Sequence, residues 1–374
     1  MNLDDVPAID QHAHNLLKSE FAEREPFASA FTESGDPALV MHHASHTLFY
    51  RRSLREIADL LGCEPSEDVI LSRRREMGER KLTALCFEAS ILSAVFLDDG
   101  LLPEKSHPWE WHRQFVPVRR ILRIESLAET LLESSESFDS FVDAFRSRID
   151  PPSRETVAFK SIAAYRSGLK ITPVTEKTAR SRFPVLRHHK SSRNCRLSDK
   201  AFIEYLITLT LDAASTHGLP VQFHTGFGDA DLDLRLSNPL HLRRILEDPR
   251  WRKVPVVLLH GGYPFTREAG YLASVYPQVH VDAGLSVPFL SASGMRALLQ
   301  QLLELAPTTK IMFSSDARLI PEMYYLAAKW GRRTLGDVLD RAVADSDLTA
   351  EEAERSARRI LHENARRLYL EGRH

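Results

Sequence analysis

Ala8-Ile9-Asp10-Gln11-His12-Ala13-His14 is the stretch from which the fold of this chain can be worked out. Alternate side chains of an extended strand share a face, so His12 and His14 project together with the small Ala13 between them. Two neutral imidazoles at a strand end form half of a divalent-metal site. An isolated His-x-His pair is more often two histidines without a shared partner, so the prediction depends on what lies downstream.

Three apolar runs far downstream each end in a further candidate ligand. They are residues 221–224, 256–260 and 311–316, which end in His224, His260 and Asp316. With the runs at 8–14, 93–97, 118–124, 156–160 and 279–282 they give eight predicted strands, and helical periodicity separates most of them. This alternation predicts an α/β fold, a (β/α)8 TIM barrel, with a doubly wound open sheet as the alternative. Only the barrel gathers the ends of strands one, five, six and eight around one point.

We expect a single barrel over residues 1–374 with two helical additions. Residues 15–92 are too long for a simple strand-to-helix connection and predict a helical insertion that acts as a lid. His42, His43 and His46 lie in it and either reach the site or stay on the surface. Residues 345–374 predict a C-terminal helix packed on the barrel, whereas the basic segment 172–196 has no clear period.

The composition excludes several classes of partner. A net charge of −2 with interspersed signs gives no reason to expect nucleic acid or an anionic membrane as partner. Cys63, Cys86 and Cys195 form no paired set, which suits a reducing compartment, and neither a signal peptide nor a membrane span is recognisable. We therefore expect a cytoplasmic protein that acts on a small molecule, with homo-oligomerisation left open.

The ligand pattern resembles that of the amidohydrolase superfamily, with His-x-His on strand one, lysine on strand four, histidines on strands five and six, and aspartate on strand eight. Residues 159–169 (FKSIAAYRSGL), 223–229 (FHTGFGD) and 360–369 (ILHENARRLY) are similar to the second amidohydrolase subgroup. They most resemble the amidohydrolase-like domain that some members carry fused to a glutamine synthetase.

This resemblance implies a metal-dependent hydrolase that cleaves a C–N bond with a metal-activated water. His12, His14 and Asp316 would hold the first ion, and Asp316 would also accept the proton of the water and pass it to the leaving nitrogen. His224 and His260 would hold a second ion, or His260 alone would polarise the substrate. Nitrogen and carboxylate ligands suit zinc best and also permit manganese or iron. The substrate suggested is an amide of a small acid, such as a γ-glutamyl-like amide.

Two other functions remain open at this stage. The same subgroup resembles metal-dependent, non-oxidative decarboxylases of aromatic or unsaturated carboxylic acids. A barrel that only binds or scaffolds is a third hypothesis, which the intact set of five ligand positions disfavours.

Lys160 decides the number of ions. If its amine is carboxylated it bridges two metals, and if it is instead paired with an acid such as Glu125, a single ion is favoured. Arg166 and Tyr165 are candidates for binding a substrate carboxylate, and Glu125 and Asp229 for binding a substrate amine. His46 is the lid residue that we include among the substrate-binding candidates.

Overall fold

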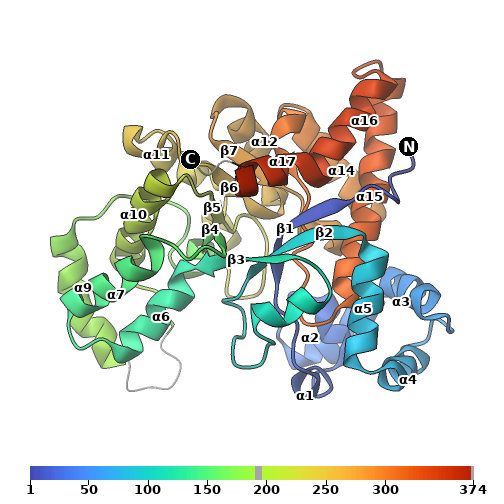
Figure 1. Cartoon of the computed structure of the whole chain (residues 1–374), viewed down its shortest axis with the longest axis horizontal. Helices are drawn as coiled ribbons and strands as arrows, with labels where there is room; N and C mark the ends of the chain where they lie inside the picture. The colour runs from blue at the N-terminus through green and yellow to red at the C-terminus, as the bar shows by residue number, and fades with distance from the viewer. Residues whose placement is uncertain (190–195, 372–374) are drawn as a thin grey trace.

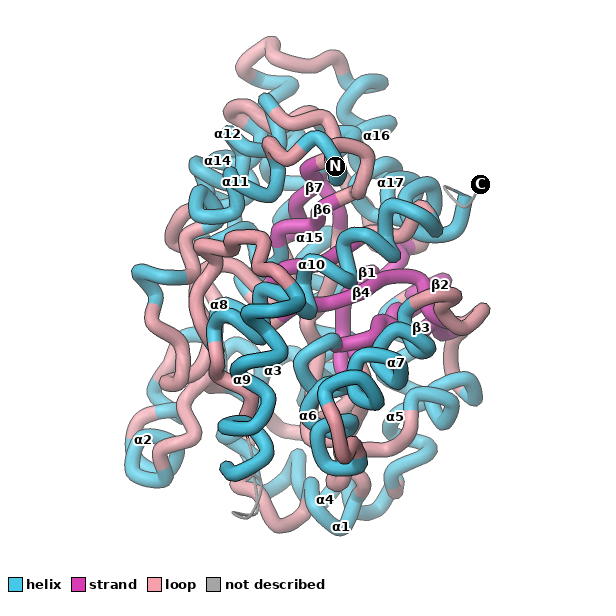
Figure 2. The backbone as a smooth tube through the Cα atoms, turned by 90° about the vertical axis from the view of Figure 1, so that its left-hand side faces the viewer, coloured by secondary structure: helices cyan, strands magenta, loops and turns pink. Residues whose placement is uncertain are grey.

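Eight parallel strands form one sheet in the computed structural model, which describes residues 1–189 and 196–371. Each strand pairs with the next one along the chain, in the order β1 to β8 (Figures 1 and 2). The strands are β1 Ala8–His14, β2 Leu92–Asp98, β3 Val118–Arg123, β4 Thr156–Ser161, β5 Val221–Phe223, β6 Val256–Leu258, β7 Val279–Asp282 and β8 Ile311–Met312. Cys195 lies outside the described residues.

The sheet closes where the chain beyond β8 runs beside β1. Gln11 N donates to Phe313 O (3.4 Å), Asp316 N to His12 O (3.0 Å) and His14 N to Ala317 O (2.8 Å). These main-chain hydrogen bonds join the first strand to the last, so the predicted barrel is confirmed and the open sheet is wrong.

Several strands are shorter than predicted at their carboxyl ends. The pairing with the preceding strand ends at Leu258 in β6 and at Met312 in β8, and beyond these ends His260 (φ 68°) and Asp316 (φ 52°) adopt the left-handed conformation. Residues other than glycine rarely take this conformation, and where they do they often serve a function. The predicted third strand also ends one residue early, at Arg123, so Glu125 lies in the first turn of a helix.

The insertion predicted at 15–92 is helical up to β2 and lies on one side of the barrel (Figure 1). The helix α3 ends where Gly62 takes φ 64°, as expected from its sequence. The following helical run is split in two by Gly78. The elements are α1 Ser19–Ala22, η1 Phe27–Phe31, α2 Pro37–His42, η2 Ala44–His46, α3 Leu48–Leu61, α4 Glu67–Met77 and α5 Glu79–Ser90.

The remaining helices surround the strands (Figure 2). The unplaced segment 172–196 contains a helix, α9, and a helix of 23 residues, α15, follows strand β8. The longer ones are α6 Ile124–Ser134, α7 Phe138–Ile149, α9 Glu176–His189, α10 Lys200–His217, α12 Thr266–Val275, α14 Ala292–Leu303, α15 Glu322–Ala344 and α16 Ala350–Arg358. Within the described ranges, no helix combines the length and apolar character needed to cross a membrane.

The C-terminal segment closes one end of the barrel interior. After α16 it continues through the π-helical turns η9 Arg359–Glu363 and η10 Arg367–Glu371, with α17 Asn364–Arg366 between them. Ala365 and Tyr369 are buried in one apolar cluster with strand residues that include Ile9 and Phe96. The segment therefore fills the barrel core at the end opposite the site, and residues 372–374 lie outside the description.

Candidate metal centre

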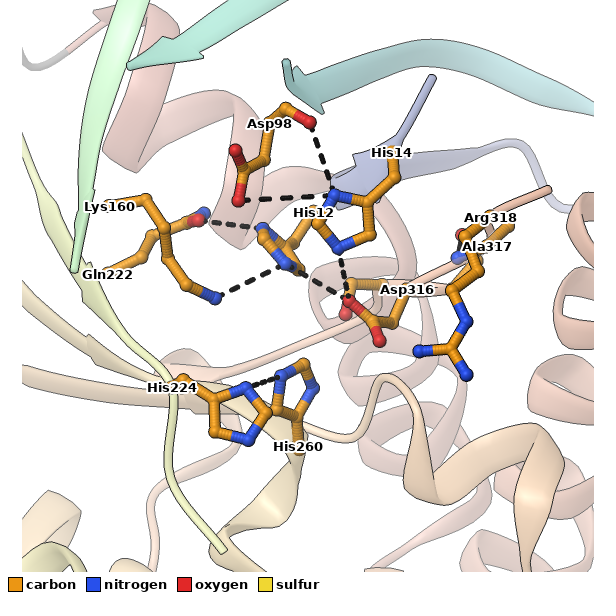
Figure 3. A network of polar contacts seen from close by, with 12 residues as sticks. His12, His14, Asp98, Lys160, Gln222, His224, His260, Asp316, Ala317 and Arg318 are labelled. Atoms are coloured by element: carbon orange, nitrogen blue, oxygen red, sulfur yellow. Dashed lines mark hydrogen bonds and ion pairs between the residues drawn. The ribbon is translucent and has the colours of Figure 1, made fainter. Parts of the chain in front are cut away.

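His12, His14 and Asp316 meet at the carboxyl end of β1 (Figure 3). Asp316 Oδ1 lies 3.1 Å from His12 Nε2 and 3.3 Å from His14 Nε2. All three side chains are buried, and Asp316 Oδ1 accepts no hydrogen bond of good geometry. Two ring nitrogens and a carboxylate oxygen thus converge without satisfying one another. This donor set fits a divalent ion of the zinc, manganese or iron type.

The second nitrogen of each ring is held by the protein. His12 Nδ1 lies 2.8 Å from Gln222 Oε1, and His14 Nδ1 lies 3.1 Å from the main-chain oxygen of Asp98. Because these oxygens only accept, a proton on Nδ1 of each ring satisfies both contacts and leaves Nε2 as the ligand atom that faces Asp316. Outer partners of this kind orient metal-binding histidines.

His224 and His260 lie together below His12 and Asp316 in Figure 3. His260 Nε2 is 3.0 Å from His224 Nδ1, and His224 Nε2 is 3.0 Å from Phe227 O. His260 Nδ1 is buried without a hydrogen-bond partner. Ligand atoms of His12, His260 and Asp316 lie within 4.8 Å of one another, so His260 can reach the same centre.

Burial keeps these histidines in the form that binds metals. It lowers the pKa of His12 to about 4, and it lowers the pKa of His224 and of His260 well below the usual range. The charged form is disfavoured because it would have to leave water. At neutral pH the rings are therefore neutral and available as ligands.

Lys160 reaches the centre from β4. Its Nζ lies 3.4 Å from His12 Nε2, and the side chain is buried. Burial lowers the pKa of Lys160 to about 8, although Asp98 and Asp316 oppose that shift. The alternative partner, Glu125, instead accepts a hydrogen bond from Ser161 Oγ at 2.6 Å.

A cavity of about 640 Å³ opens above these residues. Tyr165, Arg166 and Asp229 line it, as do His14, Lys160, His224, His260 and Asp316. The ring of Tyr165 packs on His224 with centroids 4.4 Å apart. Arg166 is paired with Glu129 (Nη2 to Oε1, 3.1 Å).

The loop after β5 accommodates Tyr165 only because residue 228 is glycine. A Cβ atom at Gly228 would lie 1.9 Å from the hydroxyl oxygen of Tyr165. Asp229 follows directly and accepts a hydrogen bond from Asp231 N at 2.9 Å. Residues 223–229 therefore shape the part of the cavity wall around Tyr165.

Two of the predicted substrate-binding residues are not at the cavity. His46 is exposed, contacts Arg51 (Nδ1 to Nη2, 3.3 Å) and is absent from the cavity wall. His42 and His43 are exposed as well. Glu125 is buried beside Ser161, because the start of α6 turns it away from the mouth. Neither His46 nor Glu125 lines the cavity in this structure.

Other residues of the site are absent from the sequence prediction. Asp98 ends the apolar run at 93–97, a signal equal to that of Asp316, but Asp98-Asp99-Gly100 suggests a turn. Its carboxylate is held by Arg123 (Nη2 to Oδ2, 2.7 Å). Gln222 is a polar residue inside an apolar run, and Arg318, which lines the cavity, carries no sequence signal that we can identify.

The family model described as amidohydrolase matches residues 179–370, just over half of the 374 residues. The chain belongs to the amidohydrolase family. Among curated relatives of this amidohydrolase, protein fluG of Emericella nidulans is 32% identical over 97% of this chain. The match spans 45% of fluG, so this chain corresponds to about half of that protein's length.

Solved structures share the fold of this chain. A provisionally named metal-dependent hydrolase from Lactobacillus casei has a TM-score of 0.87 and 29% identity, covering 99% of this chain and 98% of its own. A uronate isomerase from Thermotoga maritima has a TM-score of 0.65 at 14% identity, covering 98% of this chain and 95% of its own, and shows the shared fold alone.

Proposed function

We propose that this amidohydrolase cleaves a C–N bond, an amide of a small acid with a γ-glutamyl-like amide as the first candidate. The observation that carries the proposal is the convergence of His12 Nε2, His14 Nε2 and the unsatisfied Asp316 Oδ1 beside a cavity of about 640 Å³. The match to the amidohydrolase family model, and the provisional name of the Lactobacillus casei structure, support a hydrolase.

His12, His14 and Asp316 would hold a divalent ion, and we propose zinc. When bound, such an ion supplies a Lewis acid and lowers the pKa of water to near neutrality. The second carboxylate oxygen of Asp316 would take a proton from an attacking water and pass it to a leaving nitrogen. His260 is the nearest additional ligand, and would otherwise polarise the substrate carbonyl.

Three residues of the cavity wall are proposed to hold the substrate. Arg166 lines the cavity and offers a guanidinium for a carboxylate. Tyr165 adds a hydroxyl donor, and Asp229 offers a carboxylate for an amine. Together they suit a small substrate that carries both charges.

Lys160 is proposed to decide between one ion and two. The amine nitrogen of Lys160 lies 3.4 Å from His12 Nε2, the nitrogen that we propose binds the ion. Among the described residues, no buried acid accepts a hydrogen bond from this amine. Carboxylated, it would bridge two ions held by the two histidine pairs. We favour this arrangement.

Metal analysis of the purified protein combined with a substrate panel tests the function. The panel contains γ-glutamyl amides, other amides of small acids, and aromatic carboxylic acids. We expect release of an amine from an amide, abolished by a chelator and restored by zinc. Release of CO₂ from an aromatic acid without amide cleavage would replace our proposal with decarboxylation.

A further inference from the structure

Gln222 faces the ring of His12 from strand β5, and we propose that it is a positioning residue which sets the nitrogen that His12 offers to a metal ion. The inference rests on the proposed function, because it takes His12 as a ligand. Gln222 Oε1 lies 2.8 Å from His12 Nδ1, and both side chains are fully buried (Figure 3). A proton held on Nδ1 leaves the lone pair of Nε2 for the ion.

An irregularity in β1 makes this contact possible. The pairing of β1 with β2 shifts register between Asp10 and Ala13. Neighbouring residues of a regular strand point to opposite faces, yet Gln11 and His12 both contact the side chain of Gln222. The register shift therefore allows the side chains of Gln11 and His12 to contact the same amide group, that of Gln222.

The amide of Gln222 is restricted to one orientation. Its Nε2 donates to the main-chain oxygen of Gln11 at 2.9 Å, an atom that only accepts. It is also 2.9 Å from Gln11 Oε1 and 2.9 Å from the hydroxyl oxygen of Tyr369. A flipped amide would place oxygen against the carbonyl of Gln11, so Oε1 must face His12.

Gln11 is oriented in turn by Asp282. Gln11 Nε2 donates to the carboxylate of Asp282, which also accepts from His260 N (2.6 Å) and Ser314 Oγ (2.6 Å). Because the amide nitrogen of Gln11 donates to this carboxylate, the amide oxygen of Gln11, Oε1, faces Gln222. The two glutamines therefore fix each other's orientation.

Tyr369 extends this network to the C-terminal segment. Its hydroxyl donates to Gln11 Oε1 and accepts from Gln222 Nε2, and its ring packs against Phe96 with centroids 5.2 Å apart. The last helical turn of the described chain therefore helps to orient a ligand of the metal centre from inside the barrel.

The test compares Gln222→Leu, Gln222→Glu and Tyr369→Phe in the full chain by zinc affinity, measured in competition with a chelator. Removing an outer partner typically costs 10–100-fold in metal affinity, and we expect that loss in Gln222→Leu. Gln222→Glu keeps an acceptor for His12 Nδ1 and should bind zinc more tightly than Gln222→Leu, although a buried carboxylate destabilises the fold. Tyr369→Phe should lose affinity by a smaller factor.

Two matched variants control for the loss of a buried polar group. Gln278→Leu removes a buried glutamine whose Nε2 donates to Leu246 O at 2.8 Å, and Tyr50→Phe removes a hydroxyl that donates to Glu67. Both lie outside the centre, and we expect their zinc affinity to equal that of the unmodified protein.

Zinc affinity of Gln222→Leu within about twofold of the unmodified protein would overturn the inference, as would weaker binding by Gln222→Glu than by Gln222→Leu. If Gln222→Leu does not fold, nitrogen-15 NMR of metal-free, unmodified protein decides. A proton on His12 Nδ1 supports the inference, and a proton on Nε2 overturns it. This measurement needs no bound zinc, so a protein that binds no zinc but carries the proton on Nδ1 would contradict the proposed function and leave the orientation of His12 by Gln222 intact.

Discussion

The two histidine pairs of the site are held in different ways. His12 and His14 each direct Nδ1 to an oxygen outside the pair, and both Nε2 atoms remain within 3.3 Å of Asp316 Oδ1. His224 and His260 instead contact each other, at 3.0 Å between Nδ1 and Nε2. The first pair is thus already arranged for an ion, whereas the second must give up its mutual contact to offer those nitrogens. We expect the first pair to bind more tightly.

The largest effect should come from the first pair and its carboxylate. His12→Ala, His14→Ala and Asp316→Ala should each abolish turnover and lose metal, because each removes one of three converging ligands. The barrel should survive, since its core is apolar. Turnover, metal content and circular dichroism check this, and near-normal activity with metal still bound would remove that residue from the site.

Changes in the second pair should be severe but incomplete. His260→Asn and His224→Asn should lower kcat by about 10²–10³-fold, the effect typical of losing one electrostatic contact to the transition state. At least one ion should stay bound. If either variant loses all its metal, as His12→Ala should, the two pairs do not differ as we infer.

Lys160 tests whether the second pair holds an ion of its own. If the carboxylated amine bridges two ions, Lys160→Met should lose one of them and most activity, with partial rescue by added short carboxylic acids. Lys310→Met is the control, because Lys310 Nζ donates to the main-chain oxygens of Ala273 and Tyr276, outside the site. A single ion in the active protein, kept by Lys160→Met, would sink the bridged arrangement.

A smaller effect is expected at the cavity wall. Tyr165→Phe should raise KM for the preferred amide by roughly 2–10-fold, the equivalent of one hydrogen bond, and leave metal content unchanged. The ring still packs on His224, so a loss of metal would show that the hydroxyl serves the histidine pair rather than the substrate.

The smallest effect is expected in the insertion. His46→Ala should leave KM within about twofold, because His46 is exposed and paired with Arg51. Steady-state kinetics on the same amide check this. A fivefold increase would mean that the insertion closes over the cavity during turnover.

The strand ends were the predictable part of the molecule. Apolar runs followed by His224, His260 and Asp316 indicated the barrel, because strand burial and side-chain alternation are local properties of a sequence. The contacts of Gln222 depended on a register shift in β1, and the placement of His46 on how the insertion packs. Local periodicity predicts neither the contacts of Gln222 nor the placement of His46, because both depend on long-range packing.

The hydrogen bonds between β1 and the chain beyond β8 also determine when, during synthesis, the metal centre can be completed. Asp316 N donates to His12 O, and these residues are 304 positions apart, from 316 − 12. Ribosomes add about 5–20 residues per second, so His12 and His14 wait roughly 15–60 s for their third ligand. During that time the growing chain carries His12 and His14 without Asp316. We predict that chains stalled before residue 311 do not retain zinc against a chelator, and that released full-length chains do, which pull-down of ribosome-bound chains followed by metal analysis can measure.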